Sequence, residues 1–149
     1  MTPSCNVISV NISEKKGTIK TPRPFIAINQ HGVEGDAHAG NWHRQVSLLA
    51  EESIRKFEKK LGRELDYGEF AENITTKGIV LYETLPGDLF VIGDTKLEVT
   101  QIGKKCHGDG CQIFQIVGSC VMPKEGIFCK VIQGGIIKPG DKIEYIKCS

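Results

Sequence analysis

Short runs of β-branched and apolar residues, set apart by glycine-containing turns, recur along almost the whole chain. Strand-like runs cover residues 6–12, 25–28, 46–49, 73–76, 88–92, 95–102, 126–132 and 142–146. Gly-Asp turn signals occur at 35–36, 87–88, 93–94, 108–109 and 140–141, and Gly134-Gly135 adds another. Many short strands joined by tight turns are typical of sandwiches and barrels. The sequence therefore predicts a mainly β fold, a closed or half-closed barrel.

One segment has the periodicity of a helix instead. From about residue 50 to 61, the apolar residues Ile54, Phe57 and Leu61 fall on one helical face. Acidic residues begin this segment and lysines end it, as the helix dipole favours, and Gly62 can terminate it. We expect one substantial helix here, with short extra helical turns elsewhere. Because no linker or low-complexity tract divides the 149 residues, we expect a single domain over 1–149.

Charge and hydropathy exclude several classes of protein. The chain carries 19 basic and 18 acidic residues, whereas a nucleic-acid-binding domain usually has a basic excess or stripe. No apolar run approaches the roughly 18 residues that cross a bilayer, and the first residues lack the features of a signal peptide. We therefore expect a cytoplasmic protein with no nucleic-acid or membrane partner. In that compartment its six cysteines are expected to be reduced.

The stretch from Lys104 to Cys111 contains the leading candidate for a reactive side chain. Cys106 follows Lys104 and Lys105 and precedes His107, just after a strand-like run. A thiol reacts or binds metal as the thiolate, and nearby positive charge favours that form. Two interpretations stay open from the spacing alone: a functional thiolate that binds a soft metal or carries sulfur, and a structural thiol in a glycine-rich turn.

A zinc site is a further possibility for these cysteines. Its ligands would be Cys106, His107, Cys111 and either Cys120 or Cys129. Structural zinc sites usually combine two short ligand pairs. The wide gap between Cys120 and Cys129 makes a poor second pair, so the pattern disfavours zinc.

A second group of polar residues lies in the glycine-rich segment 32–46, between two strand-like runs. Arg44 is suited to a forked contact with phosphate, and His38 to donation to an oxyanion. Binding groups concentrate on loops held by a rigid scaffold. The plain alternative is a surface loop whose polar groups are satisfied, in which Asp36 stabilises its own turn.

Several segments in a fixed order are similar to those of a known family. They are Gly35–Gly40, Arg44–Leu49, Phe70–Thr76, Leu89–Asp94, Cys106-His107, Gly118–Phe128, Gly134-Gly135 and Gly140-Asp141. In order and spacing these resemble the MOSC family, named for the C-terminal domain of molybdenum cofactor sulfurase, in its short stand-alone bacterial type. The resemblance covers about residues 5–146.

This resemblance implies a MOSC-like β-barrel that binds molybdenum cofactor, a molybdopterin, or handles its sulfur. The key cysteine of the family maps onto Cys106, which is expected to be both the catalytic residue and the thiolate ligand of molybdenum. Candidate cofactor-binding residues are Asp36, His38, Arg44, Asn73, Lys105 and His107, among which Arg44, His38 and Lys105 are expected to meet the phosphate. Pyridoxal phosphate, which belongs to larger fusion proteins of the family, is not expected in this chain.

Three functions follow as alternatives. The first is cofactor maturation or delivery through the Cys106 thiolate, with a cofactor-accepting enzyme or a sulfur donor as partner. The second is a stand-alone molybdoenzyme that reduces N-hydroxylated or N-oxide compounds. The third is a non-enzymatic metal-binding or structural domain, which would lose its fold on chelation.

Overall fold

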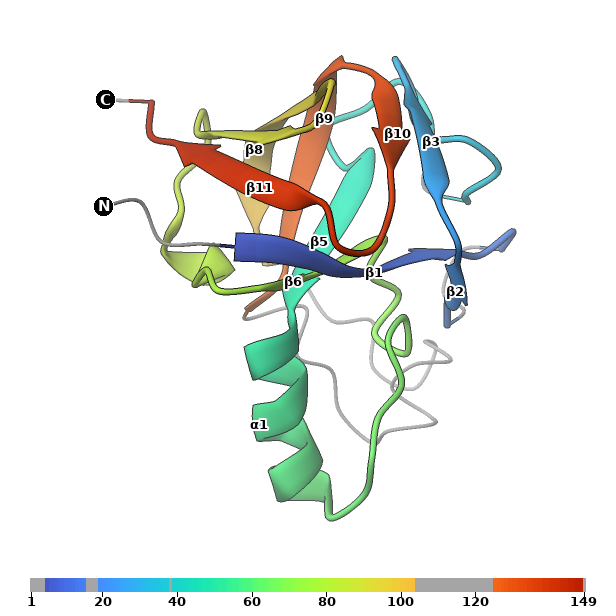
Figure 1. Ribbon diagram of the computed structural model, residues 1–149, viewed down its shortest axis with the longest axis vertical. Coiled ribbons are helices and arrows are strands. Elements are labelled where there is room, and N and C mark those ends of the chain that lie inside the picture. The colour runs from blue at the N-terminus through green and yellow to red at the C-terminus, as the bar shows by residue number, and fades with distance from the viewer. Residues whose placement is uncertain (1–4, 16–18, 38, 104–124, 149) are drawn as a thin grey trace.

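The computed structural model describes residues 5–15, 19–37, 39–103 and 125–148 (Figure 1). Its elements are β1 (Cys5–Ile12), β2 (Thr21–Arg23), β3 (Ile26–Asn29), β4 (Gly32–Val33), β5 (Val46–Ala50), α1 (Glu51–Leu61), β6 (Ile74–Lys77), η1 (Leu81–Glu83), β7 (Leu89–Ile92), β8 (Thr95–Ile102), β9 (Ile127–Gln133), β10 (Gly135–Ile137) and β11 (Lys142–Ile146). The mainly β prediction, with one substantial helix and a further short helical turn, is confirmed.

Seven strands close into a barrel in the order β1, β11, β7, β8, β9, β5, β6 and back to β1. All neighbours in this ring are antiparallel except β5 and β6, which run parallel and are connected through α1. Strand β2 extends the sheet beyond β1, and β10, β3 and β4 form a separate three-stranded sheet. The connection between the two parallel strands contains α1 and residues 62–73, which lie on the outside of the barrel (Figure 1).

Alternate residues of the ring strands fill the barrel interior. Leu97 and Val99 of β8, Leu48 of β5 and Phe90 of β7 have no exposed surface, which is the two-residue period of a strand with one buried face. Ile74 of β6 belongs to the same cluster. The interior is packed with apolar side chains, so the polar chemistry has to lie outside it.

A second apolar layer joins α1 to the outer face of the barrel. Leu49 of β5 and Phe128 of β9 point outward and pack with Ile54 and Phe57 of α1 and with Phe70. The rings of Phe57 and Phe70 meet edge to face, with centroids 5.5 Å apart. This layer fixes α1 beneath the barrel in the view of Figure 1.

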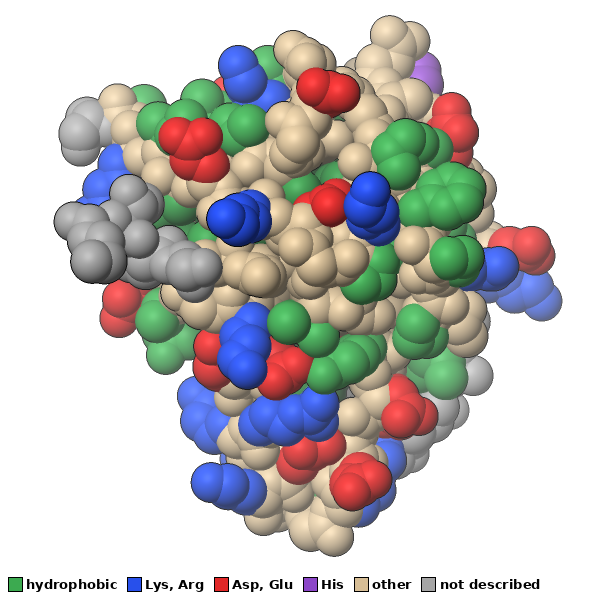
Figure 2. All heavy atoms as spheres, viewed as in Figure 1, with side chains coloured by type: hydrophobic (Ala, Val, Ile, Leu, Met, Phe, Trp, Pro, Cys, Tyr) green, Lys and Arg blue, Asp and Glu red, His purple; other side chains and the backbone are tan. Residues whose placement is uncertain are grey.

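The helix ends where the sequence predicts. Gly62 takes the left-handed conformation, with φ of 74°, and its N–H donates to the carbonyl of Glu58. No described helix is long and apolar enough to cross a membrane. On the face shown in Figure 2, basic and acidic side chains are interspersed over α1, so this face carries no stripe of one sign.

Candidate functional site

The structure describes some of the predicted site residues and not others. Asp36, Arg44 and Asn73 lie within the described part of the chain, whereas His38, Lys105, Cys106 and His107 lie outside it. The roles of all seven stay predictions. The geometry below concerns the first three and the described residues around them.

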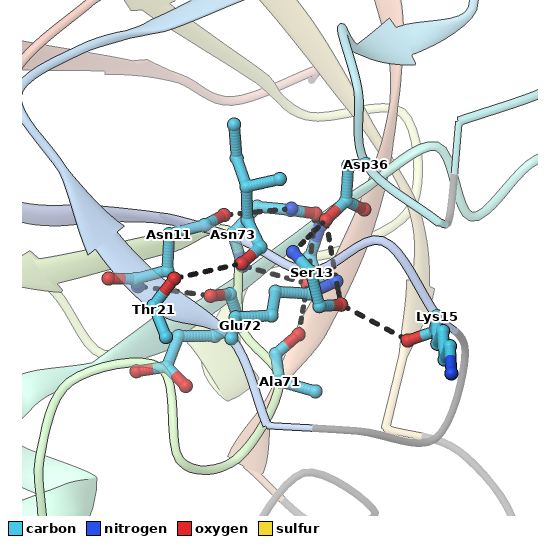
Figure 3. A network of polar contacts seen from close by, with 11 residues as sticks. Asn11, Ser13, Lys15, Thr21, Asp36, Ala71, Glu72 and Asn73 are labelled. Carbon is cyan, nitrogen blue, oxygen red and sulfur yellow. Dashed lines mark hydrogen bonds and ion pairs between the residues drawn. The ribbon is translucent and has the colours of Figure 1, made fainter.

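Asp36 forms a fully buried ion pair with Lys20. The Lys20 ammonium donates to Asp36 Oδ1 at 2.7 Å, and neither side chain has exposed surface. The same ammonium donates to the Ser13 hydroxyl at 3.0 Å, and the Ser13 N–H donates to Asp36 Oδ1 at 3.0 Å (Figure 3). A buried charge that loses its partner is strongly destabilising, so each member of this pair depends on the other. Lys20 therefore fixes the Asp36 carboxylate just past the end of β1.

Asn73 joins β5 and β6 to β1. Its Oδ1 accepts from the Ser47 N–H at 3.0 Å and from the Ser47 hydroxyl at 3.2 Å, and its Nδ2 donates to the Asn11 carbonyl at 3.2 Å. The side chain is completely buried. Both ends of the amide are thus occupied by the protein, and Asn73 shapes this flank of the barrel whether or not it also meets a ligand.

The neighbouring Glu72 is a buried carboxyl group. Its Oε2 accepts from the Gly68 N–H at 3.0 Å and from the Thr75 hydroxyl at 2.9 Å, while Oε1 has no partner among the described residues. Burial raises the pKa of Glu72 to about 7. The preceding residue, Ala71, has a φ of 65°, a conformation that a residue with a Cβ adopts only under strain. Figure 3 shows the Glu72 carboxylate turned away from Asp36.

Arg44 lies half-buried just before β5, on the outer face of the barrel. Its guanidinium carbon is 5.1 Å from the ring centroid of Trp42 and 5.7 Å from that of Phe128. Aromatic faces attract and orient a guanidinium. Its Nε is buried and finds no acceptor in the part of the chain that the structure describes. An oriented arginine with an unused buried donor is suited to an acceptor-rich anion such as phosphate.

Side chains near Arg44 hold the end of β8, after which the Cys106 segment begins. The His43 ring nitrogen Nε2 lies 2.8 Å from Gln101 Oε1, and Gln101 Nε2 donates to the Gly103 carbonyl at 2.7 Å. The Thr100 hydroxyl donates to the His43 carbonyl. The Gly103 N–H donates to the Gly126 carbonyl at 2.7 Å. Gly103 and Gly126, which precede and follow the stretch that contains Cys106, are therefore adjacent in space.

Glu125 lies against the first turns of α1. Its carboxylate accepts from the Ser53 hydroxyl at 2.6 Å and from the Lys56 ammonium at 2.6 Å. A pocket of about 420 Å³ lies here, lined by Glu125, by the start of α1 and by the segment 78–82. Lys56 also lies over the Tyr82 ring, 5.9 Å from its centroid.

The described cysteines are Cys5, Cys129 and Cys148. Within residues 5–15, 19–37, 39–103 and 125–148, no group of three or more His, Cys, Asp and Glu side chains is placed to hold a metal ion. Cys129, considered as a zinc ligand, is buried in the barrel interior, and burial raises the pKa of its thiol. Burial thus favours the neutral thiol, whereas metal binding requires the thiolate.

A family model described as MOSC domain matches residues 35–144, a range that contains Asp36, Arg44 and Asn73. The chain belongs to the MOSC domain family. That family is associated with molybdenum cofactor, which makes this MOSC domain, in general terms, a cofactor-related domain. No curated protein matches the sequence closely enough to count as a relative.

Solved structures share the fold of this MOSC domain at low sequence identity. The YuaD protein from Bacillus subtilis superposes with a TM-score of 0.84 at 16% identity, covering 98% of this chain and 97% of that one. YiiM from Geobacillus stearothermophilus gives 0.74 at 22% identity, over 96% and 75% of the chains. YiiM from Escherichia coli gives 0.60 at 20% identity, over 99% and 71%. These likenesses support the barrel fold.

Sequence reasoning missed two side chains of this flank, Lys20 and Glu72. Lys20 stands in an exposed-looking Thr-Pro-rich stretch, and only the fold shows that it pairs with Asp36. Glu72 reads as an ordinary turn residue before a strand. No local pattern identifies either residue, because what distinguishes both is the burial of a charged or titratable side chain, which depends on the fold.

Proposed function

We propose that the chain, as one domain over residues 1–149, binds molybdenum cofactor through the Cys106 thiolate and serves in cofactor maturation or delivery. The observation that carries this proposal is Arg44, an arginine oriented by two rings with a buried donor unused by the described residues. A phosphate group, such as that of the pterin, matches this donor in charge and geometry. When bound, the cofactor would bring a thiophilic metal centre that accepts a thiolate ligand.

The location of Arg44 supports the same site. Its neighbour His43 contacts Gln101 at the end of β8, and Cys106 follows Gly103 by three residues. Three residues of chain span at most about 11 Å. The Cys106 thiolate can thus supply the metal ligand near the place where Arg44 would bind the phosphate.

The remaining candidates would complete the contacts around the ligand. Asp36 is proposed to act from beneath the surface, because its buried carboxylate, held by Lys20 and by the Ser13 N–H, fixes the loop that leads to Arg44. Asn73 keeps β5, β6 and β1 in register around this flank. Lys105, His107 and His38 are proposed as further contacts to the cofactor, with Lys105 and His38 toward the phosphate.

The decisive measurement is metal and pterin content after expression in a host that makes molybdenum cofactor. We expect molybdenum and pterin in the wild type and loss of both in Cys106→Ser. The matched control is Cys148→Ser, since Cys148 is an exposed free cysteine at the other end of the chain. Cofactor retained by Cys106→Ser at the wild-type level would refute the assignment. Turnover of an N-hydroxylated compound by the loaded protein would favour the stand-alone enzyme over delivery.

A titration with isolated cofactor tests Arg44 separately. Arg44→Ala should weaken binding by at least about tenfold, the size expected for loss of a charge-assisted contact. Lys142→Ala, at an exposed position of β11, removes the same charge from a strand that carries none of the candidate residues and should leave binding unchanged. Equal effects of the two substitutions would show a non-specific dependence on charge and would remove Arg44 from the site.

A further inference from the structure

Gln45, a buried amide next to Arg44, is hydrogen-bonded to three separate segments of the chain. The residue is 5% exposed and directly precedes β5. A glutamine side chain offers two N–H donors and one carbonyl acceptor. Its Nε2 donates to the Gly40 carbonyl at 2.7 Å and to the Gln30 carbonyl at 3.1 Å. Its Oε1 accepts from the Val131 N–H at 2.8 Å. Both donors and the acceptor oxygen are therefore used, each by the backbone of another residue.

These bonds reach the segments that carry the two aromatic rings of the Arg44 site. A Cβ added to Gly40 would lie 3.7 Å from Trp42 Cδ1, so the Gly40 backbone lies close to the indole. Val131 belongs to β9, the strand that also carries Phe128. The amide thus joins the loop beside Trp42 to the strand of Phe128. The positions of the two rings that contact the guanidinium are linked through this one side chain.

The strand that follows Gln45 is held by its own ladder hydrogen bonds. The β5–β9 pairing begins at Val46 and Cys129, and the β5–β6 pairing at Leu48 and Ile74. Neither pairing uses the side chain of Gln45. A substitution of that side chain should therefore act on the loop before β5 and leave the barrel ladder in place.

The three bonds of Gln45 require an amide. Methionine has nearly the same length but no N–H group to donate. A glutamate carboxylate would keep an acceptor for the Val131 N–H, but it would turn an oxygen toward the Gly40 and Gln30 carbonyl oxygens. Acceptors that face each other without a hydrogen between them cost free energy when they are buried. Each substitution thus removes the link between loop and strand in a different way.

We propose that Gln45 is a positioning residue for an oxyanion site at Arg44. Gln45 touches no ligand. It holds the rings of Trp42 and Phe128 where they orient the Arg44 guanidinium, whose carbon lies 5.1 Å and 5.7 Å from the two ring centroids. A binding group whose support is fixed beforehand loses less conformational freedom when the ligand arrives. This proposal rests on the proposed function, in which Arg44 binds the phosphate of the cofactor.

NMR titration with sulfate tests the proposal without the cofactor. The signal to follow is the Nε–H of Arg44, identified by its absence from the spectrum of Arg44→Lys. We expect a saturable shift in the wild type, and a sulfate dissociation constant at least about tenfold higher in Gln45→Met. The matched control is Gln133→Met, also on β9, which removes a donor to the Asp94 carbonyl at 2.8 Å. Its dissociation constant should stay within about twofold of the wild type.

Gln45→Glu supplies a result that lower stability alone would not produce. Sulfate keeps its charge from about pH 8 to about pH 5, whereas a buried carboxyl group takes up a proton in this range. The protonated carboxyl group can donate to the Gly40 carbonyl and accept from the Val131 N–H, as the amide does. The ratio of the variant's dissociation constant to that of the wild type should therefore fall as the pH falls. Taking this ratio removes the contribution of the titratable and charged groups nearby that both proteins share: His31, His43, Arg44 and Lys130.

The possible outcomes separate this proposal from the proposed function. A wild type without a saturable shift would overturn both, because Arg44 would bind no oxyanion. Sulfate binding that is equally tight in the wild type, Gln45→Met and Gln45→Glu at every pH would overturn the role of Gln45 alone. Equal losses in Gln45→Met and Gln133→Met would overturn it too, by showing a general effect of losing an amide. Sulfate binding that depends on Gln45 would support the role of Gln45 even in a protein that retains no cofactor.

Discussion

Replacing Glu72 with glutamine removes a carboxyl group that the fold buries completely. Burial raises the pKa of Glu72 from an ordinary value of 4.5 to about 7, although Gly68 and Thr75 both donate to the carboxylate. Between these two pH values the folded protein holds a proton that the unfolded chain has released. At about 1.36 kcal/mol per pH unit, the interval corresponds to about 3 kcal/mol.

The sign follows from which state binds the proton. Since the folded state binds it more tightly, raising the pH through this interval lowers the free energy of unfolding of the wild type. Glutamine stays neutral at every pH and has nearly the shape of the protonated side chain. The stability of Glu72→Gln relative to the wild type should therefore rise by about 3 kcal/mol from about pH 4 to about pH 8, and the two should nearly coincide at the lower value.

Urea unfolding followed by far-ultraviolet circular dichroism gives the required free energies at each pH. Comparing the two proteins at the same pH cancels the titration of all other groups. Glu144→Gln, on the exposed side of β11, is the matched control and should show no such rise. A difference between Glu72→Gln and the wild type that stays constant across the pH range would refute the reasoning.

Three further substitutions test the packing of the candidate site. Lys20→Met should lower the free energy of unfolding by about 3–5 kcal/mol, because it removes the cation that pairs with the buried Asp36 carboxylate. A loss below about 1 kcal/mol, measured by urea unfolding, would mean that the pair is solvated. Gly68→Ala should cost at least about 2 kcal/mol, since φ is 90° there and the added Cβ would strike the Lys20 carbonyl oxygen; a thermal midpoint equal to that of the wild type would contradict this. Asn73→Ala should lower the free energy of unfolding by about 2–4 kcal/mol, because it leaves the Ser47 N–H and the Asn11 carbonyl without partners inside the protein; Asn73→Asp keeps the acceptor and should lose less in the same urea assay.

The sequence predicted the ring strands and the helix because each has its own periodicity. Thr95–Ile102 alternates buried and half-buried positions over most of its length, and Ile54 and Phe57 share one helical face. Strands β2, β4 and β10 escaped prediction. Strand β2 is exposed throughout and contains Pro22, and β10 begins at Gly135, which reads as a turn. These short strands form because a neighbouring strand supplies hydrogen-bond partners. The local sequence contains no sign of that neighbour.

In the candidate site, too, some features were visible in the local sequence and others depend on residues that are distant in sequence. Asp36 and Arg44 stand out in a polar, glycine-rich segment, so residue type alone drew attention to them. Lys20 lies 16 positions from Asp36, and its burial depends on β2 folding back along β1. The aromatic faces around Arg44 come from Trp42 and Phe128, the second of which is remote in sequence. The sequence thus identified candidate residues by their chemical type. The residues that each of them contacts could be identified only from the fold.

The seam between β1 and β11 has a consequence for how the chain folds. Cys5 pairs with Ile143 and Asn6 with Lys142, so the ring closes only when residues 138 positions apart in sequence meet. Bringing such distant segments together costs about 4 kcal/mol of loop-closure entropy before any contact forms. Contacts between residues so far apart in sequence slow folding. During synthesis, the edge of β1 that pairs with β11 stays unpaired until β11 has left the ribosome. We expect this seam to form last, and its amide protons to exchange with solvent before those of β8 and β9.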